Sequence, residues 1–327
     1  SLPELAEIAE HNHAIFKELQ KISNIDYKTT RYINLAHDEP TFNALDASRA
    51  WSDAYMVDPK NFQKEISPYF STKSKRYLGA LITNDCWQAT PGKVVDLIRN
   101  MGISAGGRIV EDCKVLEVMK EGSTYSILAL THDKKYVEFR TEIFVNALGA
   151  GAGKICEGLG IHAGLYPVRH QAFITRRLPM LGKNGDSLDM LIDRQEYKGF
   201  SAVYGQQLAH TGQIIGCASP RVDALRTDKN LILNTKEFME IISEFFVDWI
   251  PELAGVSIQA TWSGYYTEPR YIVDPELGLF VGMRGHGFML SQYLAKMYVD
   301  KLMGRPVPEY FDQLKLNGPG LSEKAFK

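Results

Sequence analysis

The sequence predicts a mixed fold that is α/β near both ends of the chain and antiparallel (α+β) in the middle. Apolar residues recur at helical spacing in five segments: 3–21, 41–54, 91–102, 235–248 and 288–303. Short strand patterns fill residues 104–148, and further strand candidates follow at 166–177, 199–205, 212–219 and 256–266. The length of 327 residues and the hydrophobic content of 45% allow two domains with cores of ordinary size.

Several elements have recognisable boundaries. Strands are expected at 32–36 and 78–83, and Thr90 and Pro91 are expected to open a helix as N-cap and first helical residue. An antiparallel meander is expected from segments 113–119, 124–131, 136–139 and 143–148, with Lys134 and Lys135 at a solvated hairpin tip.

Charge, cysteine spacing and hydropathy argue against several classes of protein. The formal net charge of −2 gives no reason to expect a nucleic-acid partner. Four widely separated cysteines without CxxC spacing predict reduced thiols and a cytoplasmic protein, with peripheral attachment to a membrane as the alternative. No apolar run reaches the roughly 18 residues that a membrane span needs. His11 and His13 do not share a helix face, so no metal site is expected.

A glycine-rich stretch, Gly149 to Gly153, follows the predicted strand 143–148. Free backbone N–H groups at such a junction can hold a phosphate. The G-x-G-x-x-G spacing fails, because Lys154 takes the place of the third glycine and the following helix can run only over 152–158. We therefore expect these glycines to let the backbone pass close to a bulky neighbour.

Four motifs occur in an order typical of one enzyme family. They read V-N-A-L-G-A over 145–150, Y-P-V-R-H-Q over 166–171, Y-Y-T-E-P over 265–269 and G-M-R-G-H-G-F over 282–288. They resemble the V-N-A-A-G-x-W, P-V-R-G-Q, Y-T-x-x-P and G-x-x-G-H-G-F motifs of the D-amino-acid oxidase superfamily, with Gly151 in place of the tryptophan. The resemblance covers essentially the whole chain and is nearest to sarcosine oxidase-like, dimethylglycine-like and dye-linked proline dehydrogenase-like enzymes.

The resemblance implies an FAD-binding Rossmann-like domain and an antiparallel-sheet substrate domain. The FAD-binding domain would comprise residues 1–24, 85–164 and 262–327, and the substrate-binding domain residues 25–84 and 165–261. The family's amino-terminal strand–GxGxxG–helix–strand has no counterpart in the sequence. The FAD-binding domain is therefore expected to lack its first βαβ unit and to bind FAD less tightly.

The resemblance also implies which residues contact cofactor and substrate. The segment similar to 107–118 contributes the valine that holds the flavin adenine by its backbone, and the 282–288 block lies against the isoalloxazine ring. The implied cofactor-binding residues are Val115, Ala147, Gly149, Gly151, Gly282, Arg284, Gly285, His286, Gly287, Phe288 and Met289. The implied catalytic residues are Tyr266, Arg270, Arg284 and His286.

Structural roles stay open for these four residues. Arg270 and Arg284 are candidates for the cation that an anionic substrate or reduced flavin needs, and a solvated or salt-bridged arginine is the alternative for each. Tyr266 either binds the substrate carboxylate or packs in the core. We expect His286 to pack or hydrogen-bond at the flavin edge rather than to transfer a proton.

Three departures from the family motifs bear on function. Gly264 replaces the cysteine that carries covalent flavin, so FAD is expected to be non-covalent. Met289 replaces the lysine that pairs with a substrate carboxylate. No lysine lies within two residues of the 213–218 strand, where oxidases of the sarcosine type place one beside flavin N5.

These features predict an FAD-dependent oxidoreductase that oxidises a small amino acid or secondary amine by hydride transfer to flavin N5. The missing lysine predicts a dehydrogenase that passes electrons to a dye, a quinone or a partner protein. The alternative is a non-catalytic or flavin-deficient subunit that retains the fold. Homo- and hetero-oligomers are both compatible with the sequence.

Overall fold

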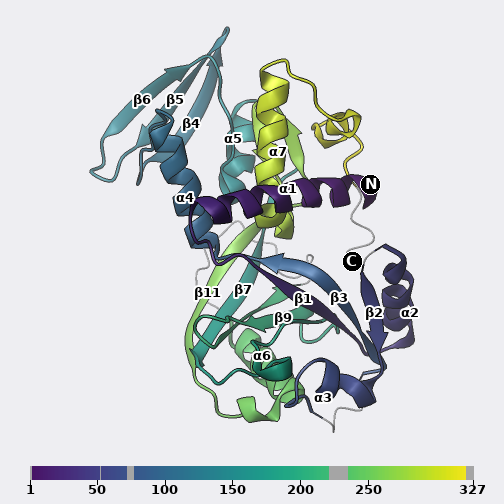
Figure 1. The fold of residues 1–327 in the computed structure, drawn as a ribbon. Helices are drawn as coiled ribbons and strands as arrows, with labels where there is room; N and C mark the ends of the chain where they lie inside the picture. The colour runs from purple at the N-terminus through teal and green to yellow at the C-terminus, as the bar shows by residue number, and fades with distance from the viewer. Residues whose placement is uncertain (1, 52, 72–76, 221–234, 322–327) are drawn as a thin grey trace. The chain divides into compact units, whose positions relative to one another are not determined.

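The computed structural model describes residues 2–51, 53–71, 77–220 and 235–321, and the chain divides into two compact units (Figure 1). Unit 1 comprises Ser1–Tyr27, Ala89–Pro167 and Tyr266–Lys327, and unit 2 comprises Lys28–Gln88 and Val168–Tyr265. The boundaries expected from the sequence lie within four residues of these divisions.

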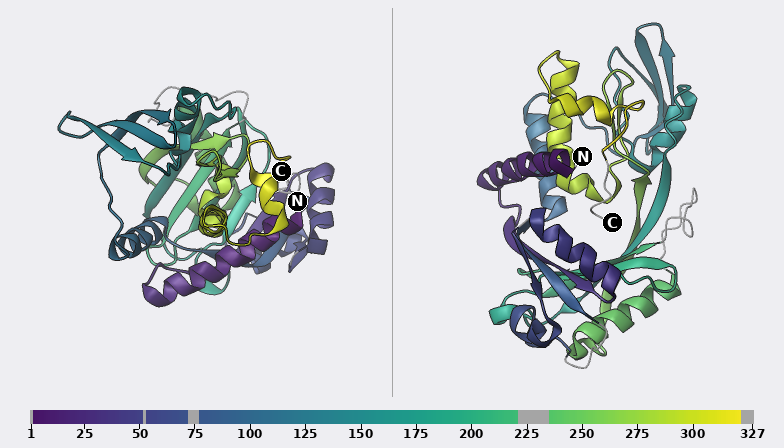
Figure 2. Two further views of the ribbon diagram at one scale, coloured as in Figure 1. Left: turned by 90° about the horizontal axis from the view of Figure 1, so that it is seen from above. Right: turned by 90° about the vertical axis from the view of Figure 1, so that its right-hand side faces the viewer.

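Unit 1 contains the helices α1 (Leu2–Ile22), α4 (Pro91–Ser104), α5 (Ala152–Gly158) and α7 (Gly287–Leu302). Leu5 and Ile8 of α1 pack with Leu290 and Leu294 of α7 in one buried cluster, which explains the helical spacing of these apolar residues. The purple α1 crosses the yellow α7 in both Figure 1 and Figure 2. Asn12, fully buried between them, accepts a hydrogen bond from the Tyr293 amide (2.8 Å).

Helix α4 begins as the sequence predicts, with one difference at its cap. Thr90 occupies the N-cap and Pro91 the first turn, but the Thr90 side chain makes no capping hydrogen bond. Its hydroxyl instead donates to Asp26 Oδ2 (2.6 Å), and Lys93 Nζ also binds Asp26 (2.8 Å). A charged acceptor competes successfully with the backbone N–H groups for this hydroxyl.

The predicted meander is a three-stranded antiparallel sheet in unit 1. It runs β4 (Lys114–Glu121), β5 (Thr124–Leu130) and β6 (Tyr136–Thr141), in that order. Lys134 lies in the tip between β5 and β6, with a φ of 60°. A second, two-stranded sheet pairs β12 (Ile272–Asp274) with β13 (Leu279–Val281).

The strand expected at 143–148 is wrong. Only Asn146 pairs, through a single parallel bridge to Leu279. Its N–H donates to the Gly278 carbonyl (2.7 Å) and its carbonyl accepts from the Phe280 N–H (3.0 Å). Ile143, Val145 and Leu148 are exposed. Within the described residues, no strand pairs with this segment along its length.

Unit 2 is built on an eight-stranded sheet. Two of its strands, β7 and β11, cross a boundary between the units and so contain residues of both. The order is β11-β7-β10-β9-β8-β1-β3-β2. The strands are β1 (Lys28–Ala36), β2 (Ala54–Val57), β3 (Gly79–Gln88), β7 (Tyr166–Arg177), β8 (Met190–Asp193), β9 (Phe200–Gln207), β10 (Gln213–Pro220) and β11 (Ile258–Glu268). The sheet is mixed rather than purely antiparallel, because β1 and β8 pair in parallel.

Helix α6 (Lys236–Trp249) covers one face of this sheet. Its Phe246 packs so closely on β9 that a Cβ atom at Gly205 would lie 2.4 Å from the ring. Thr235 caps α6 by accepting from the Phe238 N–H (3.2 Å). Trp249 is fully buried in the core, whereas Trp262 is exposed.

The helix expected over 41–54 is wrong at its C-terminal end. Helix α2 spans Glu39–Ser48 only, and Ala54–Val57 forms the edge strand β2. Ala54, the last residue of the expected helix, pairs with Thr83 of β3, so sheet pairing outweighs the helical pattern there. The other short helices are α3 (Phe62–Glu65) and the 3-10 turns Arg49–Trp51, Pro59–Asn61, Gly149–Gly151, Lys183–Gly185, Pro251–Leu253, Arg284–His286 and Glu309–Leu314.

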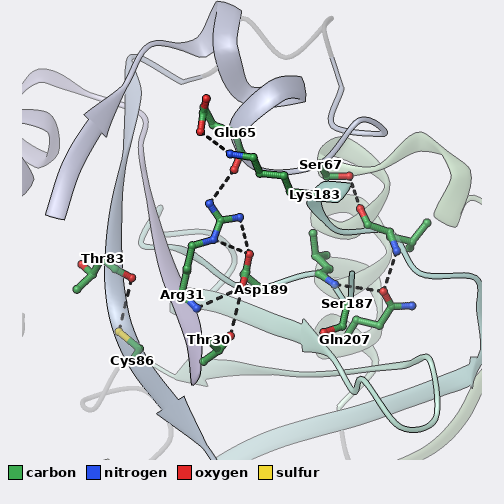
Figure 3. Close-up of polar contacts among 12 residues, drawn as sticks. Thr30, Arg31, Glu65, Ser67, Thr83, Cys86, Lys183, Ser187, Asp189 and Gln207 are labelled. Atoms are coloured by element: carbon green, nitrogen blue, oxygen red, sulfur yellow. Dashed lines mark hydrogen bonds and ion pairs between the residues drawn. The ribbon is translucent and has the colours of Figure 1, made fainter. Parts of the chain in front are cut away.

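A polar brace fixes the parallel junction of unit 2 (Figure 3). Asp189, just before β8, accepts from Arg31 Nη2 (2.6 Å), Arg31 Nε (2.9 Å) and the Arg31 backbone N–H (3.2 Å). Arg31 also donates to the Glu65 carbonyl (3.0 Å), and Lys183 binds the Glu65 carboxylate (2.9 Å). Arg31, with two guanidinium N–H groups on Asp189 Oδ2, ties β1 and α3 to the start of β8.

Candidate functional site

Two segments of unit 1, 266–271 and 282–288, contact one another along their length. Gly282 has a φ of +73°, and a Cβ there would lie 1.9 Å from the Arg270 carbonyl oxygen. A Cβ at Gly285 would lie 3.0 Å from the Tyr266 ring. The glycines of the G-x-x-G-H-G-F motif therefore allow the loop to pack directly on the Tyr266–Arg270 backbone and ring.

An ion pair joins the two segments at Arg284. Its Nε lies 2.6 Å from Glu268 Oε2, and the side chains are 15% and 11% exposed. Arg284 has a φ of +47°, a conformation that costs an arginine about 1–2 kcal/mol. A charge-assisted bond inside a largely buried site is strong enough to hold this backbone.

His286 is held by Tyr271. The Tyr271 hydroxyl lies 2.7 Å from His286 Nδ1, and Tyr271 is buried. The expected hydrogen-bonding role of His286 therefore has a partner within the protein. This contact leaves Nε2 as the ring atom turned away from Tyr271.

Arg270 is occupied by the backbone of the C-terminal segment. Its Nη2 donates to the Lys315 and Leu316 carbonyls (2.6 Å each), and its Nη1 donates to the Gly318 carbonyl (2.8 Å). Three of the five guanidinium N–H donors are thus committed to structure. These hydrogen bonds give Arg270 a structural role, and its expected contact with a substrate stays a prediction.

Phe288 and Met289 turn their side chains into unit 1. The Phe288 ring packs edge-on against Phe16 of α1, with centroids 5.1 Å apart. Met289 packs on the cluster between α1 and α7. Both side chains are half-buried by these contacts.

The glycine-rich stretch 147–151 lies on the surface of unit 1. Buried Asn146 anchors it, donating from Nδ2 to the Ala152 carbonyl (3.1 Å) and accepting from the Leu148 N–H (3.3 Å). Gly149 has a φ of +53°, and a Cβ there would meet nothing within 4 Å. Helix α5 covers 152–158, as the sequence predicts. The exposed glycines leave room for a bulky group against the backbone.

Val115 lies on β4, an edge strand of the three-stranded sheet. Every second backbone N–H and C=O of an edge strand points away from its neighbour. A cavity of about 260 Å³ adjoins this strand, lined by Leu116, Glu117, Val118, Leu128, Lys154, Ile155 and Gly158.

In unit 2, the sheet face opposite α6 carries a row of side chains in cross-strand register. Asn34 pairs with Ile192, Ile192 with Tyr204, Tyr204 with Cys217, and Cys217 with Ala172. The alternate residues on these strands, such as Ile33, Leu191 and Val203, belong to the core under α6. His170, two residues before Ala172, shares the row's face, and burial lowers its pKa to about 4.

The sequence profile of the DAO family, described as FAD dependent oxidoreductase, matches residues 1–301. The chain belongs to this family. No match was found among curated protein sequences.

Solved structures share the fold of this DAO family member. L-proline dehydrogenase from P. horikoshii has a TM-score of 0.75 and 21% identity, covering 94% of this chain and 81% of that chain. Glycine oxidase from Geobacillus kaustophilus has a TM-score of 0.79 and 17% identity, covering 96% and 82%. NikD, an unusual amino acid oxidase essential for nikkomycin biosynthesis, has a TM-score of 0.77 and 13% identity, covering 95% and 83%.

The residues present fit an FAD group in this DAO family member. Gly149 and Gly151 are exposed, with open space beside Gly149, and apolar Val145 and Leu148 flank them on the surface. A large planar cofactor would cover apolar surface of this kind. The cationic Arg284 at the glycine loop suits an electron-accepting ring that gains negative charge.

Sequence reasoning singled out Tyr266, Arg284 and His286, and it missed their partners Glu268 and Tyr271. Both partners lie inside or beside the Y-T-x-x-P motif, at positions where the motif specifies no residue type. The four cysteines are all free thiols, as expected. None of the helices in the described part of the chain is long and apolar enough to cross a membrane.

Proposed function

We propose that the protein oxidises a small amino acid or a secondary amine by FAD-dependent hydride transfer. The observation that carries this proposal is the packing of the Tyr266 segment on the Arg284–His286 loop. L-proline dehydrogenase, glycine oxidase and iminodiacetate oxidase are named for such substrates, and their folds support the assignment.

Each residue of this cluster has a role in the proposal. When bound, FAD supplies an acceptor at N5 for the hydride from the carbon beside the amine. Arg284 stabilises the negative charge that then develops. His286, oriented by Tyr271, donates or accepts a hydrogen bond through Nε2. The hydroxyl of half-buried Tyr266 binds the carboxylate of the substrate.

Val115, Ala147, Gly149 and Gly151 hold the cofactor through their backbones in this proposal, as do Gly282, Gly285, Gly287, Phe288 and Met289. Unit 1 is then the FAD-binding domain and unit 2 the substrate-binding domain. The face of the unit 2 sheet with Asn34, Tyr204 and His170 is the surface offered to substrate. His170 stays neutral at pH 7, since burial lowers its pKa to about 4, and so does not repel a cationic amine.

FAD is held without a covalent bond in this proposal. Gly264 stands where a cysteine would carry the flavin, and the buried Cys217 has a pKa raised to about 11 by burial, which suppresses its thiolate. Acid precipitation of the flavoprotein should release all flavin into the supernatant, and yellow colour retained in the pellet would show a covalent link.

Anaerobic mixing with a panel of amines tests the activity itself. Proline, sarcosine, glycine and simple secondary amines should bleach the flavin absorbance, and 2-hydroxy acids should not. The variant Arg284→Met should lower the rate of bleaching by about 10²–10³-fold, the usual cost of removing one preorganised charge-stabilising group. A protein that binds FAD but is bleached by no amine would instead support a non-catalytic subunit.

A further inference from the structure

We propose that Glu268 is a positioning residue that limits how strongly Arg284 stabilises the reduced flavin, and so lowers the reduction potential of the cofactor. This inference rests on the proposed function, in which Arg284 faces the flavin. It assigns a role to a carboxylate that the mechanism above does not use.

Glu268 is a buried carboxylate placed at the end of β11. The residue is 8% exposed, and its Oε2 lies 2.6 Å from Arg284 Nε. Neighbouring Thr267 is also buried, so the backbone that carries the carboxylate is fixed. Charges in such surroundings are weakly screened, and each acts strongly on its neighbours.

The other ionisable groups in or near the two segments have partners of their own. The Arg270 guanidinium is bound to three carbonyls of the C-terminal segment. His286 is paired with the neutral Tyr271 hydroxyl. Asp274, further along the chain, accepts from the Glu276, Leu277 and Leu316 amides.

The carboxylate has two consequences that differ in their tests. It holds the guanidinium by its Nε, which supports the left-handed backbone of Arg284. It also offsets the positive charge of that guanidinium, so that the field reaching an electron-rich ring is weaker than that of a lone arginine. The first effect concerns stability, whereas the second concerns the equilibrium between oxidised and reduced flavin.

The variant Glu268→Gln separates these effects, because the glutamine oxygen still accepts from Nε while the negative charge is removed. We expect the equilibrium ratio of reduced to oxidised flavin to rise about tenfold at a fixed solution potential. That change corresponds to a rise of about 30 mV in the reduction potential of the flavin, a two-electron couple. Spectroelectrochemical titration of the FAD-loaded protein measures it.

Two controls accompany this titration. Glu276→Gln removes a carboxylate of the same charge from an exposed pair with Lys315 (2.7 Å; Glu276 70% exposed), and it should leave the potential unchanged. Thermal unfolding of the cofactor-free proteins reports the structural effect alone.

A lower melting temperature for Glu268→Gln without a change in potential would overturn the inference, since Glu268 would then be only structural. A fall in potential would overturn it as well. Failure of the proposed function looks different, because the wild-type protein would then bind no flavin or would bind flavin that no amine reduces.

Discussion

Gly282 illustrates how strongly one residue can determine the candidate site. Its φ of +73° strains any side chain, and a Cβ would overlap the Arg270 carbonyl oxygen at 1.9 Å. Gly304 has a similar φ of +69°, but a Cβ there would meet nothing within 4 Å. Gly282→Ala should therefore destabilise the fold by about 3 kcal/mol or more, and Gly304→Ala by about 1 kcal/mol. Urea denaturation compares them, and equal losses would show that the contact with Arg270 is unimportant.

The His170 side chain should make the free energy of unfolding depend on pH. Burial lowers its pKa from 6.5 to about 4, so the unfolded chain binds a proton more readily than the folded protein. The stability is complete above pH 6.5 and is lost as the pH falls toward 4. Allowing for its partial exposure, the loss is about 1–2 kcal/mol. His170→Gln should reduce the difference between the denaturation midpoints at pH 7 and pH 5. An unchanged difference would show that other groups cause the pH dependence.

Residue chemistry in the site could be predicted only in part from the sequence. Arg284 and His286 stand in a glycine motif, and that motif drew attention to them. Glu268 and Tyr271 have no such signal, because their importance lies in contacts across a loop that local sequence does not encode. Arg270 shows the converse. It lies beside a motif, which drew attention to it, but its guanidinium donates to backbone carbonyls of residues 315–318.

At the scale of elements, the brace around Asp189 should control the parallel pairing of β1 and β8. Asp189→Asn leaves Arg31, whose side chain is 19% exposed, without its carboxylate. We expect the free energy of unfolding to fall by about 2–4 kcal/mol, somewhat less than for the loss of a fully buried pair. Asp46→Asn, which breaks an exposed pair with Arg49 (2.9 Å), should change stability by less than about 0.5 kcal/mol. Equal effects of the two variants in chemical denaturation would contradict this view of the brace.

Long elements were predictable from periodicity, whereas short ones depended on pairing. Helices α1, α6 and α7 each bury an apolar face, and their boundaries lie close to the expected ones. Strands β2, β8, β12 and β13 have only three or four residues each, too few for a pattern. The segment 143–148 has a strong strand pattern, yet it forms one bridge because a strand needs a partner along its length.

At the scale of the whole molecule, the proposed chemistry ends with the transfer of electrons from the reduced flavin to an acceptor. An oxidase of the sarcosine type has a lysine beside flavin N5, and its charge favours the formation of superoxide from oxygen. Strand β10, which we expect to correspond to the strand that carries this lysine, contains no lysine, and its Ile214 is fully buried in the core of unit 2. Without that lysine, we expect electrostatic stabilisation of superoxide to be weaker by several kcal/mol in a dry site, which amounts to orders of magnitude in rate.

We therefore expect the reduced protein to pass electrons to a dye or quinone much faster than to oxygen. Stopped-flow mixing of the amine-reduced protein with air-saturated buffer, and separately with an artificial acceptor, gives both rates. The variant Ile214→Lys is unsuitable, because it would bury a charge in the core. Arg284→Met is the better comparison, since it removes this cation and so tests whether Arg284 takes the place of the lysine. Oxygen reactivity should stay low in both proteins, and rapid reoxidation of the wild type by oxygen with stoichiometric peroxide would identify an oxidase instead.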